Sequence, residues 1–263
     1  MINFSSFHTH TYFCDGKNSP EEMVKEAISL GCPAIGFSGH SDTPFDAGYC
    51  MDETRENNYR SEIIRLKEEY KDDISIFLGI EQDYHSRPAD SIYEYKIGSV
   101  HYVKKDGEYI SIDNSPEILI DAVDRLYGGD IYALCEDYYK LVEDVYRKTH
   151  CQIVGHFDLI TKFQEKHPLF DENNPRYKNA ALWAINSLIE QGALLEMNTG
   201  AISRGWRTTP YPARFLLEEI SKKKSKLILT SDCHSKEHIL FKLDEAKLLC
   251  DEYNIETVQF TKE

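Results

Sequence analysis

The stretch Ile74-Ser75-Ile76-Phe77-Leu78-Gly79-Ile80-Glu81 is an apolar run that ends in a carboxylate. A carboxylate straight after an apolar strand is costly to bury unless it is paired or bound to a metal ion. Six more apolar runs end in residues that can bind a metal or a phosphate: residues 4–7 before His8 and His10, 34–37 before His40, 97–100 before His101, 152–155 before His156, 193–197 before Asn198, and 227–230 before Asp232 and His234. In a barrel of parallel strands, the strand ends on one face converge around a single mouth that holds the catalytic residues. The series therefore predicts an enzyme with a polynuclear metal site.

Helical stretches alternate with these apolar runs. Asn18-Ser19-Pro20-Glu21-Glu22 is typical of a helix start, with a capping residue, a proline in the first turn and acids near the positive end of the helix dipole. Further helices are expected after Asn114-Ser115-Pro116-Glu117 and over residues 52–70, 130–149, 176–191, 212–224 and 236–253. Strand and helix in alternation indicate parallel pairing through crossover helices. We therefore predict an α/β fold, a TIM-like barrel that forms a single domain over residues 1–263, with the site at the C-terminal ends of the strands.

Three segments depart from this alternation. Lys104-Lys105-Asp106-Gly107-Glu108 is expected to be a hairpin turn after the fourth strand. The loops at residues 42–52 and 162–176 follow strand ends and are long, so we expect them to act as lids over the site.

The composition limits the class of partner. The chain has 263 residues and a net charge of −15, which argues against a nucleic-acid backbone as the main partner. No apolar stretch approaches the roughly 18–20 residues that span a bilayer, and the N-terminus does not resemble a secretory signal. The seven cysteines, without a Cys-x-x-Cys pair, are expected to be reduced thiols in a cytoplasmic protein.

The ligand types suggest hard or borderline divalent cations. Side chains alternate along a strand, so His8 and His10 point to the same side and can reach one ion. Asp15 follows in a short loop, and Asp232 and His234 form a second alternate-residue pair. The two oxygens of the Glu81 carboxylate can bridge two cations about 3.5–4 Å apart, as in two-metal hydrolysis. Nitrogen and oxygen ligands without thiolates suit Zn, Mn or Fe.

Taken together, these motifs resemble the polymerase and histidinol phosphatase (PHP) family of metal-dependent phosphoesterases. The matching segments are His8-Thr9-His10, Cys14-Asp15-Gly16, Gly39-His40-Ser41, Gly79-Ile80-Glu81, Ser99-Val100-His101, Gly155-His156-Phe157-Asp158 and Ser231-Asp232-Cys233-His234. The resemblance covers essentially the whole chain and implies a distorted (β/α)7 barrel with a trinuclear metal centre. Within the family, the chain is most similar to the stand-alone L-histidinol-phosphate phosphatases of histidine biosynthesis.

The resemblance also implies how the ligands are shared among three divalent ions. One ion would take His8, His10, Glu81 and Asp232. A second would share Glu81 and add His101 and His156. The third would take Asp15, His40 and His234.

The reaction expected from this resemblance is the hydrolysis of a small phosphate monoester, L-histidinol phosphate, by attack of a metal-bridging hydroxide. Asp15 and His40 would orient water or help to protonate the leaving oxygen. Arg204, with Ser203 and Asn198 near it, and Lys162 are candidates for holding the phosphate, although Arg204 is equally a candidate for a surface arginine. The amine and imidazole of the substrate require a carboxylate and an aromatic ring, for which Asp42, Asp46, Asp158 and Tyr84 are the candidates.

Two other functions compete with this one. A phosphodiesterase or nuclease acting on short nucleotides would use the same metals and differ in its loops. A metal-binding or regulatory module would retain metal tightly without turning over any ester.

Overall fold

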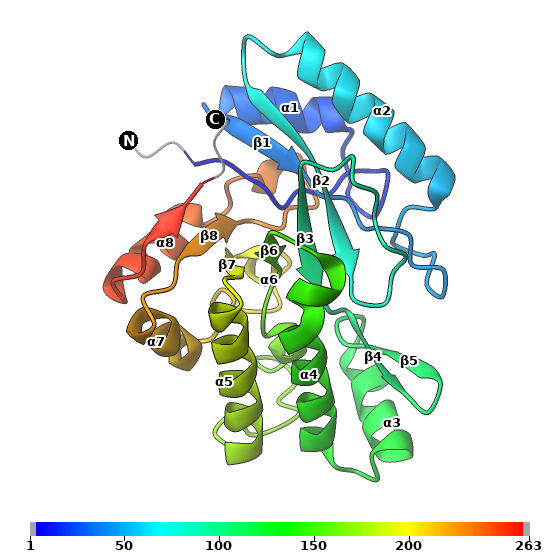
Figure 1. Ribbon diagram of the computed structural model, residues 1–263, viewed down its shortest axis with the longest axis vertical. Helices are drawn as coiled ribbons and strands as arrows, with labels where there is room; N and C mark the ends of the chain where they lie inside the picture. The colour runs from blue at the N-terminus through cyan, green and yellow to red at the C-terminus, as the bar shows by residue number, and fades with distance from the viewer. Residues whose placement is uncertain (1–3, 260–263) are drawn as a thin grey trace.

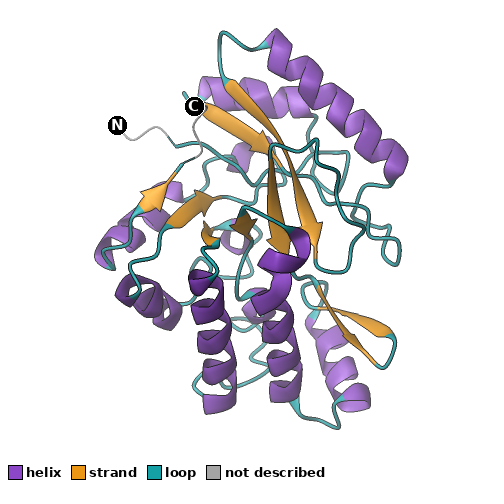
Figure 2. Cartoon of the chain, in the orientation of Figure 1, coloured by secondary structure: helices purple, strands orange, loops and turns teal. Residues whose placement is uncertain are grey.

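Parallel strands form the centre of the computed structural model, which describes residues 4–259 (Figure 1). The sheet has the order β1-β2-β3-β6-β7-β8-β9, and each neighbouring pair is parallel. Its strands are β1 (Ala34–Phe37), β2 (Ser75–Asp83), β3 (Tyr95–Ser99), β6 (Ile153–Val154), β7 (Leu194–Asn198), β8 (Leu227–Thr230) and β9 (Thr257–Val258). Figure 2 shows that this sheet is curled, with helices around its outside. The α/β, TIM-like fold that the alternation predicts is thus confirmed.

The helices begin close to the capping signals in the sequence. They are α1 (Pro20–Ser29), α2 (Glu53–Glu69), α3 (Pro116–Leu126), α4 (Ile131–Thr149), α5 (Pro175–Glu190), α6 (Gly200–Ser203), α7 (Arg214–Lys222) and α8 (Leu243–Glu252). In α1, the Ser19 side chain accepts from the backbone of Glu22 and the Glu22 side chain accepts from the backbone of Ser19. This reciprocal capping box satisfies two of the backbone donors that a helix start leaves unpaired. None of the helices within residues 4–259 is long and apolar enough to cross a lipid bilayer.

The segment after the N-terminus lies between the first and the eighth strand. Ser6 bridges Ile35 of β1, and Thr9 bridges Cys233, which follows β8, both in parallel. The backbone amide of His10 also donates to the carbonyl of Cys233 at 2.9 Å. The first apolar run, predicted to be a strand, forms these isolated bridges instead of a regular strand. The bridges nevertheless carry the chain to the mouth of the barrel, next to the end of β8.

A small apolar cluster fills the barrel below the mouth. It contains Phe7, Ala34, Phe77, Tyr95, Ile97, Ile153 and Ile228. The Tyr95 hydroxyl donates to the carbonyl of Phe7 at 2.7 Å, so this ring ties the N-terminal segment to β3. A Cβ at Gly79 would lie 2.3 Å from the Tyr95 ring, and this close approach explains the glycine in the apolar run of β2. The cluster forms an apolar floor beneath the polar residues of the mouth.

The predicted hairpin is present, and one predicted helix begins late. Strands β4 (Tyr102–Lys105) and β5 (Glu108–Ser111) pair antiparallel around Asp106 and Gly107, which both have positive φ. The helix predicted over residues 236–253 is a short 3-10 turn at Lys236–His238 followed by α8 from Leu243. Lys242 separates the two with a left-handed backbone, which an α-helix cannot include.

Candidate metal centre

All nine predicted ligands lie at the mouth formed by the C-terminal ends of the strands. They are His8, His10, Asp15, His40, Glu81, His101, His156, Asp232 and His234. Eight of them form three groups that could hold an ion, and His156 lies beside Glu81, with its Nε2 3.0 Å from Glu81 Oε1. The groups are His8, His10 and Asp232; His40, Glu81 and His101; and His10, Asp15, His40 and His234. Within each group the ligand atoms lie within 4.8 Å of one another. The structure therefore assembles, from segments far apart in sequence, the set that the strand ends indicated.

Glu81 occupies the centre of the cluster. One of its oxygens, Oε2, lies 2.9 Å from His40 Nδ1 and 3.2 Å from His8 Nε2. The other, Oε1, lies 3.0 Å from His156 Nε2 and 3.4 Å from His101 Nε2. Each oxygen thus faces a different set of imidazoles, which is the arrangement that a bridging carboxylate requires. Glu81 lies two residues before the end of β2, so the strand continues past the ligand.

The imidazoles also determine the charge of Glu81. Burial raises the pKa of this carboxyl, but His8, His40 and His101 outweigh burial and hold the pKa well below its usual range. Asp232 behaves in the same way, because Arg204 and His8 outweigh the effect of burial on its pKa. Both carboxylates are therefore ionised, which is the state that binds a cation.

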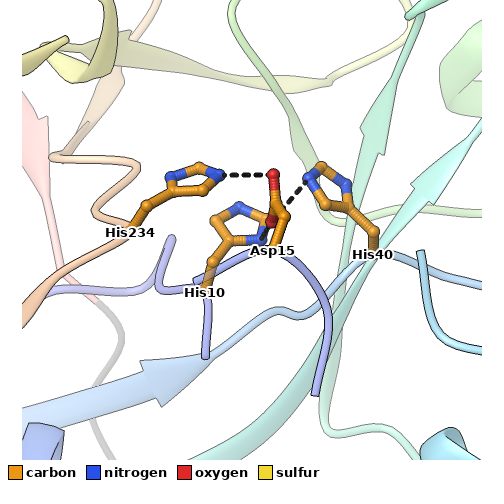
Figure 3. A group of neighbouring side chains, drawn as sticks. All are labelled: His10, Asp15, His40 and His234. Carbon is orange, nitrogen blue, oxygen red and sulfur yellow. Dashed lines mark ion pairs between the residues drawn. The ribbon is translucent and has the colours of Figure 1, made fainter. Parts of the chain in front are cut away.

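The most accessible group gathers around Asp15 (Figure 3). Asp15 Oδ2 lies 3.2 Å from His234 Nε2, and Asp15 Oδ1 lies 3.6 Å from His40 Nε2 and 3.8 Å from His10 Nδ1. The rings of His10 and His234 stack with their centroids 4.2 Å apart. Burial together with the neighbouring His234 and His40 lowers the pKa of His10 to about 3. His10 is therefore neutral and has a lone pair for a metal.

The unsatisfied buried atoms fit metal ions. Among the described residues, His8 Nε2, His10 Nε2 and Glu81 Oε2 are buried without a hydrogen-bond partner. Buried polar atoms are almost always satisfied, so three such atoms at one place indicate partners other than protein groups. Ligands made only of imidazole and carboxylate suit Zn, Mn or Fe. Cys14 Sγ lies 3.5 Å from His10 Nδ1, but burial raises the pKa of this thiol to about 12, so it is not a thiolate ligand.

The mouth opens into a cavity of about 320 Å³. Besides seven of the nine predicted ligands, its lining includes Asp46, Tyr49, Tyr102, Asp113, Lys162 and Arg204. Arg204 donates to Asp232 Oδ2 at 2.9 Å, and its guanidinium lies 2.9 Å from His234 Nδ1, so the alternative of an unattached surface arginine does not hold. Lys162 donates to the Asp113 carbonyl at 2.7 Å and to its carboxylate at 3.1 Å. Two cationic side chains are therefore fixed at the wall of the cavity.

Two other predicted substrate residues do not line this cavity. The Asn198 side chain is fully buried, and its amide bonds to Glu196 and to the backbone of Gly200. The Ser203 hydroxyl donates to the carbonyl of Gly200 within the short helix α6. Of the predicted lid at residues 162–176, only Lys162 is part of the lining, whereas Asp46, Gly48 and Tyr49 of the lid at residues 42–52 contribute to it.

Two carboxylates behind the ligands were not predicted. Glu196 Oε1 accepts from His8 Nδ1 at 2.7 Å. Asp83 Oδ2 accepts from the backbone amide of His101 at 2.7 Å and lies 3.3 Å from its Nδ1. Both residues are buried in strands that end at the mouth. For Glu196, its place inside the apolar run of residues 193–197 was the available signal, because burying an unpaired carboxylate is costly.

Comparisons with known proteins agree with this geometry. Residues 6–200 match the family described as the PHP domain. A protein named "Probable histidinol-phosphatase" from Deinococcus radiodurans is 30% identical over 260 residues, which cover 94% of this chain and 92% of the relative. The "Histidinol-phosphatase" of Bacillus subtilis is 26% identical over 253 residues, which cover 86% of this chain and 92% of that protein.

A solved structure shares the fold. It is histidinol phosphate phosphatase from Lactococcus lactis, complexed with zinc, L-histidinol and phosphate. The match has a TM-score of 0.71 at 19% identity and covers 97% of this chain and 95% of the other.

Proposed function

The chain belongs to the PHP domain family, and from that premise we propose that it hydrolyses L-histidinol phosphate to L-histidinol and phosphate. The observation that carries the proposal is the mouth of the barrel, where eight of the nine candidate ligands form three groups beside a cavity with two fixed cations. The names of the relatives that match nearly the whole chain support this substrate. The activity is therefore proposed to be that of a phosphoric monoester hydrolase, a histidinol-phosphatase.

Three divalent ions, Zn, Mn or Fe, would be held by the groups that converge on the mouth. His8, His10, Glu81 and Asp232 would hold one ion, and Glu81 with His101 and His156 a second. Asp15, His40 and His234 would hold the third. When bound, such ions lower the pKa of water so that a nucleophile is available near neutral pH, and they neutralise charge on the phosphoryl oxygens. The complex of the Lactococcus lactis protein with zinc makes Zn the first metal to test.

The cationic side chains would orient the phosphoryl group. Arg204 lies against Asp232 and His234, so its remaining N–H groups can reach an oxygen bound beside those ligands. Lys162 supplies a point charge on another part of the lining. Asp15 and His40 lie at the opening, where they would orient water or pass a proton to the leaving alkoxide.

One carboxylate fits the cationic end of the substrate. Asp46 lines the cavity beside the rings of Tyr49 and Tyr102, and its Oδ2 accepts from the Tyr102 hydroxyl at 2.7 Å. An ionised carboxylate has further acceptor sites, which an ammonium group can use. The other three candidates lie outside the lining and have other partners. Asp42 forms an ion pair with Arg87, the Tyr84 hydroxyl donates to Asp144, and Asp158 accepts from the backbone amide of Ala213. We therefore assign amine recognition to Asp46.

The charge of the protein favours this substrate over a nucleotide. The net charge is −15, and Asp46 and Asp113 add carboxylates to the cavity wall, where they would repel a second phosphate. We also propose a reducing compartment, the cytoplasm, because all seven cysteines are free.

Phosphate release by metal-loaded protein from a panel of esters tests the proposal. We expect L-histidinol phosphate to give a far higher kcat/KM than p-nitrophenyl phosphate or a dinucleotide, because its amine and imidazole supply binding energy for positioning phosphorus. A dinucleotide as the best substrate would favour the phosphodiesterase. Tight metal retention without turnover of any ester would favour the metal-binding module.

A further inference from the structure

Glu196 lies at the centre of β7 with its side chain fully buried. Its strand pairs with β6 on one side and β8 on the other, and these strands lead to His156 and Asp232. Glu196 is in none of the three groups of metal ligands in the described part of the chain. A buried carboxylate is expensive unless it is well paired, so its partners show what it does.

Both oxygens of Glu196 accept hydrogen bonds. Oε2 accepts from the backbone amide of His156 at 3.0 Å and from the side-chain amide of Asn198 at 3.0 Å. Oε1 accepts from His8 Nδ1 at 2.7 Å. The two bonds to Oε2 hold the carboxylate in place, and the third then fixes the imidazole of His8.

These partners determine which nitrogen of His8 carries a proton. A carboxylate oxygen accepts this hydrogen bond, so His8 Nδ1 is the donor. The other nitrogen, Nε2, lies 3.2 Å from Glu81 Oε2 and 3.7 Å from Asp232 Oδ1, within the metal-ligating cluster. A cation therefore competes for Nε2 alone, and Nδ1 keeps its proton.

We infer that Glu196 is a positioning residue, which holds His8 in the tautomer and orientation that present Nε2 to a divalent cation. This inference rests on the proposed metal-dependent function. Such a carboxylate behind a metal-ligating imidazole also raises the basicity of the ligand. Asn198, predicted to bind substrate, belongs to the same chain of contacts, because it holds Glu196.

The substitution Glu196→Gln tests the inference with little change in shape. The backbone amide of His156 and the side-chain amide of Asn198 both donate to the Oε2 position. They therefore favour the orientation of the new glutamine in which its amide oxygen occupies that position. The amide NH₂ then faces His8 Nδ1 and donates to it, which moves the proton of a neutral His8 to Nε2. This tautomer cannot bind a metal through Nε2.

The measurement is the Zn²⁺ affinity of metal-free protein, by competition with a chelator of known affinity. We expect Glu196→Gln to weaken the tightest binding by roughly 10–100-fold, the usual effect of removing such a partner. Asp158→Asn is the matched control, because it also removes a buried carboxylate, and the bond that Asp158 accepts comes from the backbone of Ala213. We expect this control to bind Zn²⁺ like the wild type.

Two further measurements address folding and mechanism. If Glu196→Gln does not fold, Glu196→Asp retains the charge but is too short to reach His8, and it should also lose Zn²⁺ affinity. In a His8→Gln background, Glu196→Gln should have no further effect on affinity, since its action passes through His8. Wild-type affinity in a folded Glu196 variant, or an undiminished effect without His8, would overturn the inference. Failure of the wild type to hydrolyse L-histidinol phosphate would instead refute the proposed function and leave the metal-affinity result intact.

Discussion

Buried carboxylates in this protein shift their pKa in opposite directions according to their neighbours. In Glu81 and Asp232, cationic neighbours outweigh burial and hold the pKa well below its usual range. In Asp158, burial dominates over the opposing effect of Arg207 and raises the pKa to about 6. Glu81 and Asp232 are therefore ionised at the mouth, as candidate ligands must be, whereas the buried carboxylate of Asp158 destabilises the fold when it ionises.

The raised pKa of Asp158 has a consequence for stability. The folded protein binds the proton of Asp158 more tightly than the unfolded chain does. The protonated group therefore makes its full contribution to the free energy of unfolding below the unfolded pKa of 3.8. This contribution is lost as the pH rises towards the folded pKa of about 6. Relative to the wild type, Asp158→Asn should gain roughly 2–3 kcal/mol in free energy of unfolding between pH 4 and 7. Urea unfolding of both metal-free proteins across this range measures the difference, and a difference independent of pH would contradict the assignment.

Arg204 links the candidate metal ligands Asp232 and His234 to the proposed phosphate site. Arg204→Ala should reduce kcat/KM for L-histidinol phosphate by roughly 10–1000-fold, as for the loss of other electrostatic stabilisers. Arg214→Ala is the control, because Arg214 is exposed and pairs with Glu252 away from the cavity. Steady-state kinetics with saturating Zn²⁺ separates this effect from loss of metal. Unchanged kinetics would leave Lys162 and the metals as the only holders of phosphate.

At the scale of elements, two segments combine into one wall of the cavity. The loop at residues 42–52 follows β1, and the β4–β5 hairpin follows β3. Phe45 of the loop stacks on Tyr109 of the hairpin with ring centroids 3.7 Å apart, and Tyr102 donates to Asp46 at 2.7 Å. The hairpin thus supports the loop that carries the proposed amine-binding carboxylate.

Asp46→Asn should weaken binding of the substrate amine without affecting hydrolysis of the phosphate ester. We expect KM for L-histidinol phosphate to rise about tenfold or more, since a hydrogen bond to a charged group contributes about 1.5–3 kcal/mol. The kinetics with p-nitrophenyl phosphate, which lacks the amine, should not change. Asp42→Asn on the same loop is the matched control, because Asp42 pairs with Arg87 and does not line the cavity. Equal losses on both substrates would show that Asp46 acts on the loop rather than on the amine.

At the scale of the whole molecule, the candidate metal ligands bring together segments from opposite sides of the sheet. His8 and His10 come from the N-terminal segment between β1 and β8, whereas Asp232 and His234 follow β8. His10 Nε2 lies 3.4 Å from both Glu81 Oε2 and Asp232 Oδ1. A cation bound there would join segments from the first ten and the last forty residues, so metal binding should stabilise the entire barrel.

Removal of metal should therefore lower both activity and stability. Chelator-treated protein is expected to release no phosphate, and Zn²⁺ or Mn²⁺ should restore release. A metal present at 100 times its Kd adds about 2.7 kcal/mol, which corresponds to a rise in Tm of at least about 5 °C for a chain of this size. Calorimetry with and without metal measures the shift. Full activity in protein verified as metal-free by elemental analysis would refute the metal-dependent mechanism.

Local patterns predicted most of the helices and the candidate metal ligands of this protein. Capping residues such as Ser19 act within one turn of helix, so they mark α1 without knowledge of the fold. Ligands such as Glu81 and His156 follow apolar runs, and parallel strands bring such positions to one end of a barrel. Both signals depend on residues that are close in the chain.

Tertiary structure alone decided the partners of the remaining polar groups. It paired Glu196 with His8, 188 residues away, and placed Asp46 rather than Asp42 in the cavity. It also added β9 beside β8, and it left the N-terminal segment with isolated bridges at Ser6 and Thr9 instead of a regular strand. These outcomes depend on which segments meet after the chain folds, and hydrogen bonds between distant residues leave no periodic pattern in the sequence. The sequence by itself thus determined the fold class and the candidate ligand set, whereas the folded structure determined how each candidate ligand is held.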